Sequence, residues 1–231
     1  MKYNLKTVFV GILSLTLASC GNDEADETAV VGVDSESQAT EQASTTTESG
    51  KIQYSAARFE NGVSYGELSM GDPNAPVTII EYASLTCGHC ATFHNLILPE
   101  VKKDYIETGK ARLVFRNFLL NPYDLYASMI SRCTTPEKSF ALANLFYSRQ
   151  NVWINEDYLN KLAGLARRAG MSRATVDACV TNAELQANLI ELQEYGAEVD
   201  GVTGTPTFFI NGTKIVGANR DVFIDALEDA L

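Results

Sequence analysis

The sequence is poor in several residue types that particular functions need. Among 231 residues it has one tryptophan, two histidines, and 18 basic residues against 29 acidic ones, for a net charge of −11. The shortage of positive charge argues against nucleic-acid binding, which depends largely on basic side chains that contact phosphates. An apolar run at residues 8–18 is too short for a transmembrane helix, which needs about 20 residues. We find no internal repeat.

The N-terminus has the layout of an export signal. Lys2 and Lys6 precede the apolar run, and small residues then lead to Cys20, as in secretory signals that are removed from the mature protein. The ending Leu-Ala-Ser-Cys resembles the bacterial lipobox, which implies cleavage after residue 19 and lipidation of Cys20. A plain secretory signal with a chance cysteine is the alternative. We expect 1–19 to be a lipoprotein-type signal peptide whose acyl chains on Cys20 anchor the protein in the cell envelope, facing the periplasm.

Residues 20–50 have the composition of a tether. Residues 21–50 carry eight acidic residues, no lysine or arginine and no aromatic residue. Such a segment cannot bury enough apolar surface to offset its ordering entropy, so we expect it to be disordered. Its acidic residues repel one another and favour an extended chain. A specific binding segment is the alternative, although no motif supports it.

From residue 51 onward the pattern becomes globular and predicts one domain, 51–231. We expect strands at 61–68, 77–82, 111–115, 205–210 and 214–216, with Asn211-Gly212 as a hairpin turn between the last two. Apolar spacing predicts a helix from Cys87 to near Gly109, kinked at Pro99, and a final helix at 221–231. Residues 122–199 read as helices broken at 134–136, 151–155 and 170. The order predicts an α/β fold with one mixed sheet and a helical insertion at about 118–200.

Cys87-Gly-His-Cys90 is the motif with the clearest chemistry. It follows a predicted strand and begins a helix, where unpaired N–H groups and the helix dipole stabilise a negative charge. Cys87 is therefore expected to be the low-pKa, attacking sulfur, and Cys90, one turn later, to resolve a mixed disulfide. His89 would lower the Cys87 pKa further when protonated, and Gly88 leaves the sulfur open to partners.

Zinc binding is the alternative chemistry for these cysteines. A structural zinc site needs four ligands, and the chain offers only Cys87, Cys90, His94 and His89 without a second Cys-x-x-Cys motif. We therefore favour redox chemistry and expect no metal and no cofactor. His94 is interpreted as a partly exposed helix residue.

Residues 81–90, Glu-Tyr-Ala-Ser-Leu-Thr-Cys-Gly-His-Cys, resemble the active-site segment of the DsbA-like thiol–disulfide oxidoreductases. The resemblance covers roughly 60–231 and implies a thioredoxin-like fold with an inserted helical subdomain. It implies that Glu81 is a buried acid that assists proton transfer at the deeper cysteine; a salt-bridge residue at a strand edge is the alternative. It also implies that Thr205-Pro206 is a cis-proline loop that faces the redox pair and binds substrate backbone.

Two residues leave the direction of catalysis open. The best-known oxidases of this family have proline where this chain has Gly88, and the Cys-Gly-His-Cys sequence is the one found in protein disulfide isomerases. Threonine before the cis-proline, here Thr205, also occurs in isomerase-type enzymes. Many of those enzymes dimerise through an extra N-terminal domain, which residues 21–60 do not provide. We therefore expect a monomeric oxidase, with isomerase or reductase activity as the alternative.

Cys133 and Cys179 remain, both in the predicted helical block. In an oxidising compartment a leftover pair usually forms a disulfide, and a subset of DsbA-like proteins has a second disulfide in the helical subdomain. Two separate buried thiols are the alternative. Tyr82 and Leu85 could form an apolar rim for substrates or belong to the core.

The sequence therefore predicts an enzyme that transfers its Cys87–Cys90 disulfide to exported proteins that contain thiols. The resemblance implies a membrane partner of the DsbB kind that reoxidises it. A lipid-anchored metal carrier that uses Cys87, Cys90 and His94 is the alternative from a different class.

Overall fold

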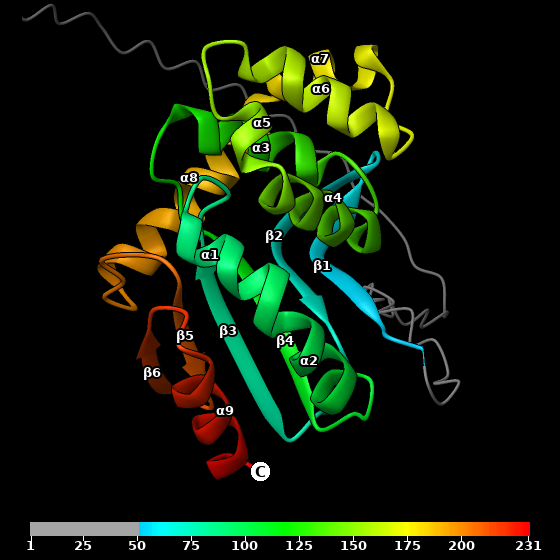
Figure 1. Cartoon of the computed structure of the whole chain (residues 1–231). Coiled ribbons are helices and arrows are strands. Elements are labelled where there is room, and N and C mark those ends of the chain that lie inside the picture. Colours follow the sequence, from blue (N-terminus) through cyan, green and yellow to red (C-terminus); the bar gives the residue numbers. More distant parts are fainter. Residues whose placement is uncertain (1–50) are drawn as a thin grey trace, which may run out of the picture. The chain divides into compact units, whose positions relative to one another are not determined.

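The computed structural model describes residues 51–231. The expected signal peptide, Cys20 and the acidic tether lie outside the described residues. Figure 1 shows a mixed sheet with helices on both of its faces. None of the helices in residues 51–231 is long and apolar enough to cross a membrane.

The sheet has six strands in the order β1-β2-β4-β3-β5-β6. Their bounds are β1 Tyr54–Glu60, β2 Val63–Met70, β3 Val77–Ala83, β4 Ala111–Asn117, β5 Thr207–Ile210 and β6 Thr213–Val216. Strands β3 and β4 are parallel, and every other neighbouring pair is antiparallel. The parallel pair lies at the centre, so β3, which leads into the Cys-x-x-Cys motif, is covered on both faces.

The start of the domain differs from our prediction. Asn61 and Gly62 do not begin a strand. They form the turn of a hairpin between β1 and β2, with φ of 50° and 78°. Asn-Gly suits this turn because both central residues need positive φ. The same Asn-Gly signal correctly predicted the β5–β6 turn at Asn211-Gly212. At the first hairpin the turn was not predicted, and neither was strand β1.

The helix that begins after Cys87 has four segments. They are α1 Gly88–Thr92, the π-helical turn η1 Phe93–Ile97, α2 Leu98–Val101 and a second π-helical turn η2 Lys102–Ile106. The chain leaves the helix at Gly109, which has a φ of 74°, near the predicted end. Pro99 lies in the first turn of α2, directly after the π-helical turn η1, and inside this continuous helix it has no backbone N–H to donate.

Six helices lie between β4 and β5. They are α3 Pro122–Arg132, α4 Pro136–Ser148, α5 Gln150–Trp153, α6 Tyr158–Arg168, α7 Arg173–Val180 and α8 Ala183–Glu198, and α9 Arg220–Asp229 follows β6. The predicted break at 151–155 is partly wrong, because residues 150–153 form α5. A break at Thr181-Asn182 was not predicted. There the Asn182 side chain accepts a hydrogen bond from Leu185 N and caps α8.

Alternate residues of β3 face different helices. Glu81 points toward the helix that begins after Cys87 and toward α4, whereas Tyr82 points toward α8. On the first face the rings of Phe93, Phe208 and Phe223 pack together, with centroids 4.5–5.1 Å apart. On the second face Tyr82 packs with Phe118 and Val202. The largest apolar cluster lies on the first face and continues into α3–α7.

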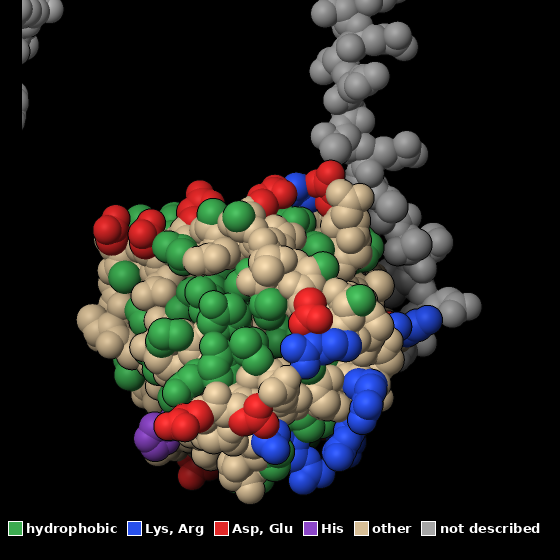
Figure 2. Space-filling view, turned by 90° about the horizontal axis from the view of Figure 1, so that it is seen from above, with side chains coloured by type: hydrophobic (Ala, Val, Ile, Leu, Met, Phe, Trp, Pro, Cys, Tyr) green, Lys and Arg blue, Asp and Glu red, His purple; other side chains and the backbone are tan. Residues whose placement is uncertain are grey.

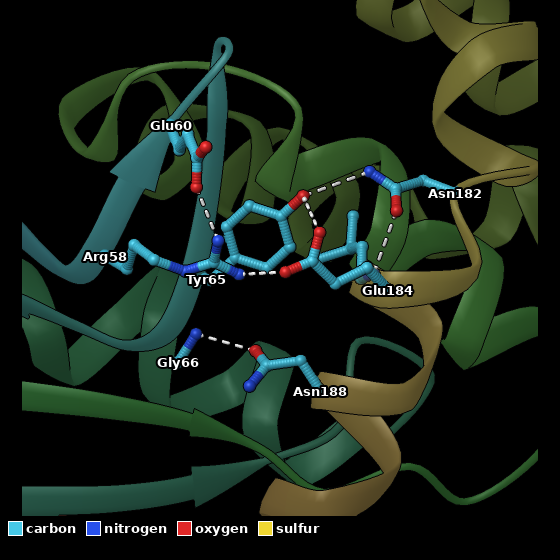
Figure 3. Close-up of polar contacts among 8 residues, drawn as sticks. Arg58, Glu60, Tyr65, Gly66, Asn182, Glu184 and Asn188 are labelled. Atoms are coloured by element: carbon cyan, nitrogen blue, oxygen red, sulfur yellow. Dashed lines mark hydrogen bonds and ion pairs between the residues drawn. The ribbon is translucent and has the colours of Figure 1, made fainter. Parts of the chain in front are cut away.

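The first hairpin is joined to the start of α8 by a polar cluster (Figure 3). Arg58 lies over the Tyr65 ring, 3.9 Å from its centroid, and forms ion pairs with Glu60 and Glu184. Asn188 accepts a hydrogen bond of 2.7 Å from Gly66 N. These contacts link segments that are more than 100 residues apart in the chain.

Candidate active site

The redox pair lies at the junction of β3 and α1. Cys87 is the N-cap residue of α1 with extended φ and ψ of −80° and 125°. Its thiol is half-buried, Gly88 and His89 are exposed, and Cys90 is fully buried. Both cysteines are free. One sulfur is therefore open to a partner while the other lies directly beneath it, which is the arrangement that thiol–disulfide exchange requires.

The surroundings separate the pKa values of the two thiols. The pKa of Cys87 is lowered to about 5, first by a hydrogen bond from the Cys90 thiol, with further hydrogen bonds from the Thr205 side chain and from the N–H groups of Cys90 and His89. Burial raises the pKa of Cys90 well above its ordinary value, as do Cys87 and the charge of Glu81. Cys87 is therefore the thiolate at neutral pH and Cys90 the thiol. His89 contributes its backbone N–H to this stabilisation, and an effect of its protonated side chain stays a prediction.

The loop before β5 faces the attacking sulfur. The Thr205–Pro206 peptide bond is cis, and Cys87 Sγ lies 3.3 Å from Thr205 O. The buried Thr205 hydroxyl has no hydrogen-bond partner among the described residues while the Cys87 thiol donates to the carbonyl. A Cys87 thiolate would offer that hydroxyl an acceptor. The structure thus brings two of the predicted residues, Cys87 and Thr205, into contact across 118 positions of sequence.

Helices of the insertion hold the loop that leads into Cys87. Gln150 Nε2 donates to Leu85 O at 2.8 Å and to Cys87 O at 3.0 Å. The buried Asp124 carboxylate accepts from Leu85 N at 2.8 Å, and Asn121 Nδ2 donates to Thr86 Oγ1 at 2.9 Å. Burial raises the pKa of Asp124 to about 6. Sequence reasoning missed all three residues because no local pattern marks them.

Glu81 and His94 form a buried pair beneath Cys90. Both side chains are fully buried, and His94 Nε2 lies 3.0 and 3.1 Å from the two Glu81 carboxylate oxygens. Glu81 lies on a central strand, not at a strand edge. Our interpretation of His94 as partly exposed is wrong, because α4 covers it. Its position four residues after Cys90 was an available signal, since such residues share one face of a helix.

The surroundings of His94 disfavour the metal-carrier alternative. One ring nitrogen faces Glu81, and the other lies 2.9 Å from Asn144 Oδ1, so both are engaged. In residues 51–231 no group of three or more histidine, cysteine, aspartate or glutamate side chains is arranged to hold a metal ion.

Tyr82 and Leu85 are fully buried and belong to the core, not to a substrate rim. The exposed apolar surface near the redox pair comes from other residues. A shallow hollow of 360 Å³ is lined by Leu119, Leu120, Asn121, Pro122, Leu125, Tyr126 and Gln193. Asn121 connects this hollow to Thr86, the neighbour of Cys87. The same end of the molecule carries a broad hydrophobic patch in Figure 2.

The other two cysteines in residues 51–231 form a disulfide. Cys133, at the end of α3, and Cys179, in α7, have Cα atoms 6.1 Å apart and are bridged. The bridge lies within the helical insertion, as predicted.

The chain resembles known proteins in sequence. A protein provisionally named protein-disulfide oxidoreductase from Rickettsia conorii is 33% identical over 167 residues, which cover 71% of this chain and 60% of that protein. The corresponding protein of Rickettsia prowazekii is 31% identical, with 71% and 61% covered. The aligned part therefore spans about three fifths of the length of these relatives.

Solved structures share the fold. Wolbachia pipientis alpha-DsbA1 superimposes with a TM-score of 0.67 at 29% identity, covering 70% of this chain and 89% of that one. A protein-disulfide isomerase from Novosphingobium aromaticivorans gives 0.62 at 26% identity, covering 71% and 98%. The predicted fold class, thioredoxin-like with an inserted helical subdomain, is confirmed. The thioredoxin family model matches residues 63–229, well over half of the chain, and the protein therefore belongs to the thioredoxin family, in its DsbA-like form.

Proposed function

We propose that the protein is a thiol–disulfide oxidoreductase that forms disulfides in exported proteins through a dithiol–disulfide cycle of Cys87 and Cys90. The observation that carries the proposal is the contrast between the two thiols. Cys87 is accessible with a pKa of about 5, and Cys90 is buried with a raised pKa. A stabilised thiolate favours the reduced form and makes the disulfide a stronger oxidant.

The cycle begins with the oxidised enzyme. A substrate thiolate attacks Cys87 Sγ, the Cys87–Cys90 bond breaks, and Cys90 leaves as a thiolate that takes up a proton. A second substrate thiolate then attacks the substrate sulfur of the mixed disulfide and releases the Cys87 thiolate. The substrate loses two electrons and gains a disulfide, and the enzyme becomes the dithiol.

The neighbouring residues receive the following roles. Glu81 exchanges a proton with Cys90, and the exposed Gly88 carries no side chain that could cover Cys87. Residues Thr205 and Pro206 would bind the backbone of the substrate beside Cys87. The apolar hollow that Asn121 helps to line supports binding of unfolded polypeptide, because it offers apolar surface close to the redox pair.

Location and partners complete the proposal. The export signal and Cys20 support an envelope protein that is lipid-anchored and faces the periplasm. A membrane protein of the DsbB kind would reoxidise Cys87 and Cys90. We propose that the protein acts as a monomer.

Disulfide isomerisation or reduction is the second candidate function. Gly88 within Cys-Gly-His-Cys favours it, and so does the similarity to the Novosphingobium isomerase. Both functions use the same two sulfurs and differ in the redox potential at which the pair operates.

The test is the equilibrium redox potential of the Cys87–Cys90 pair in the full-length protein, measured in detergent against glutathione. A value near about −120 mV, the range of strong oxidants, would support the oxidase. A value near about −270 mV, the range of thioredoxin, would contradict it and favour a reductase. A Cys133→Ala/Cys179→Ala variant is the control, since its change should not move the potential of the other pair.

A further inference from the structure

His94 is placed between the buried acid and the surface. Its side chain is fully buried, and its ring stacks on Tyr147 with centroids 4.2 Å apart and contacts the edge of Phe115 at 5.7 Å. Nε2 faces Glu81 on β3, whereas Nδ1 faces Asn144 on α4, which is an exposed residue. The ring therefore has one nitrogen on the side of the redox pair and the other on the side of solvent.

The hydrogen bonds define how many protons the pair holds. Asn144 presents its amide oxygen to Nδ1, and an amide oxygen only accepts, so Nδ1 carries a proton. Nε2 and the Glu81 carboxylate then share one further proton, on either the ring or the acid. The pair is neutral overall in both cases, which explains how a glutamate can be buried here without the cost of an isolated charge.

The charge of Glu81 acts on Cys90, the sulfur that must gain and lose a proton. That charge raises the pKa of Cys90. Burial raises the pKa of Tyr147 well above its ordinary value, and the charges of Cys90 and Glu81 raise it further. When the Cys87–Cys90 bond breaks, Cys90 becomes a thiolate in a buried site that strongly favours the thiol. A proton must reach it from within the protein, because Cys90 is inaccessible to solvent.

We propose that His94 is a proton-relay residue that works through Glu81. The pair gives its shared proton to the Cys90 thiolate when the disulfide is opened, which leaves no proton between Nε2 and the Glu81 carboxylate. In the reverse direction the pair takes the proton from Cys90 as that sulfur attacks the mixed disulfide. No electron passes through His94. This inference rests on the proposed function and extends it by naming the partner of Glu81.

Other titratable groups near the pair are Cys87 and Cys90 at the start of α1, Tyr147 on α4 and Asp124 on α3. From β4 the contact is Phe115, which does not titrate. A pH dependence that is assigned to the pair must therefore disappear when Glu81 or His94 is replaced and persist when an uncharged contact is replaced.

The first test is nuclear magnetic resonance of the full-length protein labelled at histidine nitrogens. The chain has only two histidines, and the exposed His89 gives the reference signals. We expect the His94 ring signals to differ between the oxidised and reduced wild-type protein and to lose this difference in Glu81→Gln. Identical His94 signals in both redox states would overturn the proposal. This readout needs no substrate, so it stands even if the proposed activity is absent.

The second test is the rate at which reduced glutathione opens the disulfide, measured from about pH 5 to about pH 9. We expect Glu81→Gln and His94→Gln each to lower the rate roughly 10- to 100-fold and to flatten the pH profile. The double variant should be no slower than the slower single variant, because the two residues act as one unit.

Phe115→Leu is the matched control, since it loosens packing against His94 and removes no titratable group. It should lower thermal stability and keep the wild-type pH profile. A His94→Gln variant that keeps the wild-type profile while Glu81→Gln loses it would show that His94 only supports the structure. A wild-type protein that exchanges no disulfide at all would instead contradict the proposed function.

Discussion

At the residue scale, Cys87 Sγ is surrounded by hydrogen-bond donors from two separate parts of the chain. The Cys90 thiol and two N–H groups come from α1, and the Thr205 side chain comes from the loop before β5. The helix end alone therefore does not account for the pKa of about 5. Part of the stabilisation depends on a loop that only the tertiary fold brings to the sulfur.

The low pKa of Cys87 has a consequence for stability. The pKa falls from an ordinary value of about 8.5 to about 5 in the folded, reduced protein. The thiolate therefore stabilises the reduced fold fully above about pH 8.5, less as the pH falls, and not at all below about pH 5. In denaturant unfolding with reductant, the stability advantage over Cys87→Ser should shrink steadily from pH 8 to pH 5. An advantage that does not change with pH would contradict the low pKa.

Thr205→Val removes one donor from the thiolate and keeps the shape of the side chain. Hydrogen bonds to charged groups are worth about 1.5–3 kcal/mol when buried, and Cys87 is half-exposed, so we expect its pKa to rise by about one unit. Ultraviolet absorbance of the thiolate across a pH series measures this shift. Thr203→Val, two residues earlier at an exposed position, is the control and should leave the pKa unchanged.

At the element scale, α8 packs on the face of the sheet that is opposite to His94. Its Gly196 lies against the Tyr82 ring, and Tyr82 and Arg116 bind Asp200, just after the helix. Asp200 begins the segment that ends at the cis Thr205–Pro206 bond. The packing of α8 therefore determines where the loop that faces Cys87 starts.

Gly196→Ala should disturb this contact. The new Cβ would lie 2.5 Å from Tyr82 Cε1, and overpacking of this kind costs about 1–3 kcal/mol. We expect a lower melting temperature and a slower reaction at Cys87. Gly164→Ala in α6 is the matched control, because nothing lies within 4 Å of its Cβ position, and it should stabilise the protein by up to about 1 kcal/mol. Equal behaviour of the two variants would contradict the close packing at Gly196.

At the scale of the whole molecule, the helices between β4 and β5 support the redox pair and are themselves cross-linked. Gln150 and Asp124 hold the active-site loop, and the buried Arg132 donates to Asn117 on β4 at 3.0 Å and to the backbone of Gly66 on β2. Burial lowers the pKa of Arg132 to about 9. The next residue, Cys133, forms the disulfide with Cys179 in α7.

Removal of this disulfide should reduce stability without changing the active site. The bridge joins residues 46 positions apart, and a loop of this length contributes roughly 2–4 kcal/mol. We expect Cys133→Ala/Cys179→Ala to lower the free energy of unfolding by that amount, measured in denaturant without reductant. The Cys87 pKa should stay at about 5. A shifted Cys87 pKa would show that the bridge also positions the active-site loop.

Local patterns in the sequence were enough to determine much of the fold. The buried run Val77–Ala83, the Cys-x-x-Cys motif after it, Asn211-Gly212 and the helical spacing between β4 and β5 all act over a few residues. The pairing of Cys133 with Cys179 followed from the number of cysteines and the resemblance. These features are readable because strand alternation, turn conformation and helical period depend on near neighbours. The first hairpin shows that a local signal, Asn61-Gly62, can still be overlooked.

The surroundings of the redox pair were decided by the tertiary structure. His94 is buried because α4 covers it. Its spacing from Cys90 indicates a shared helix face, but not which element covers that face. Asp124 and Gln150 reach the active-site loop from 39 and 65 residues away, and Thr205 reaches Cys87 from 118 residues away. Charges and hydrogen bonds act through distance in space, so the pKa values and the proton path at Cys90 depend on contacts that no local pattern contains.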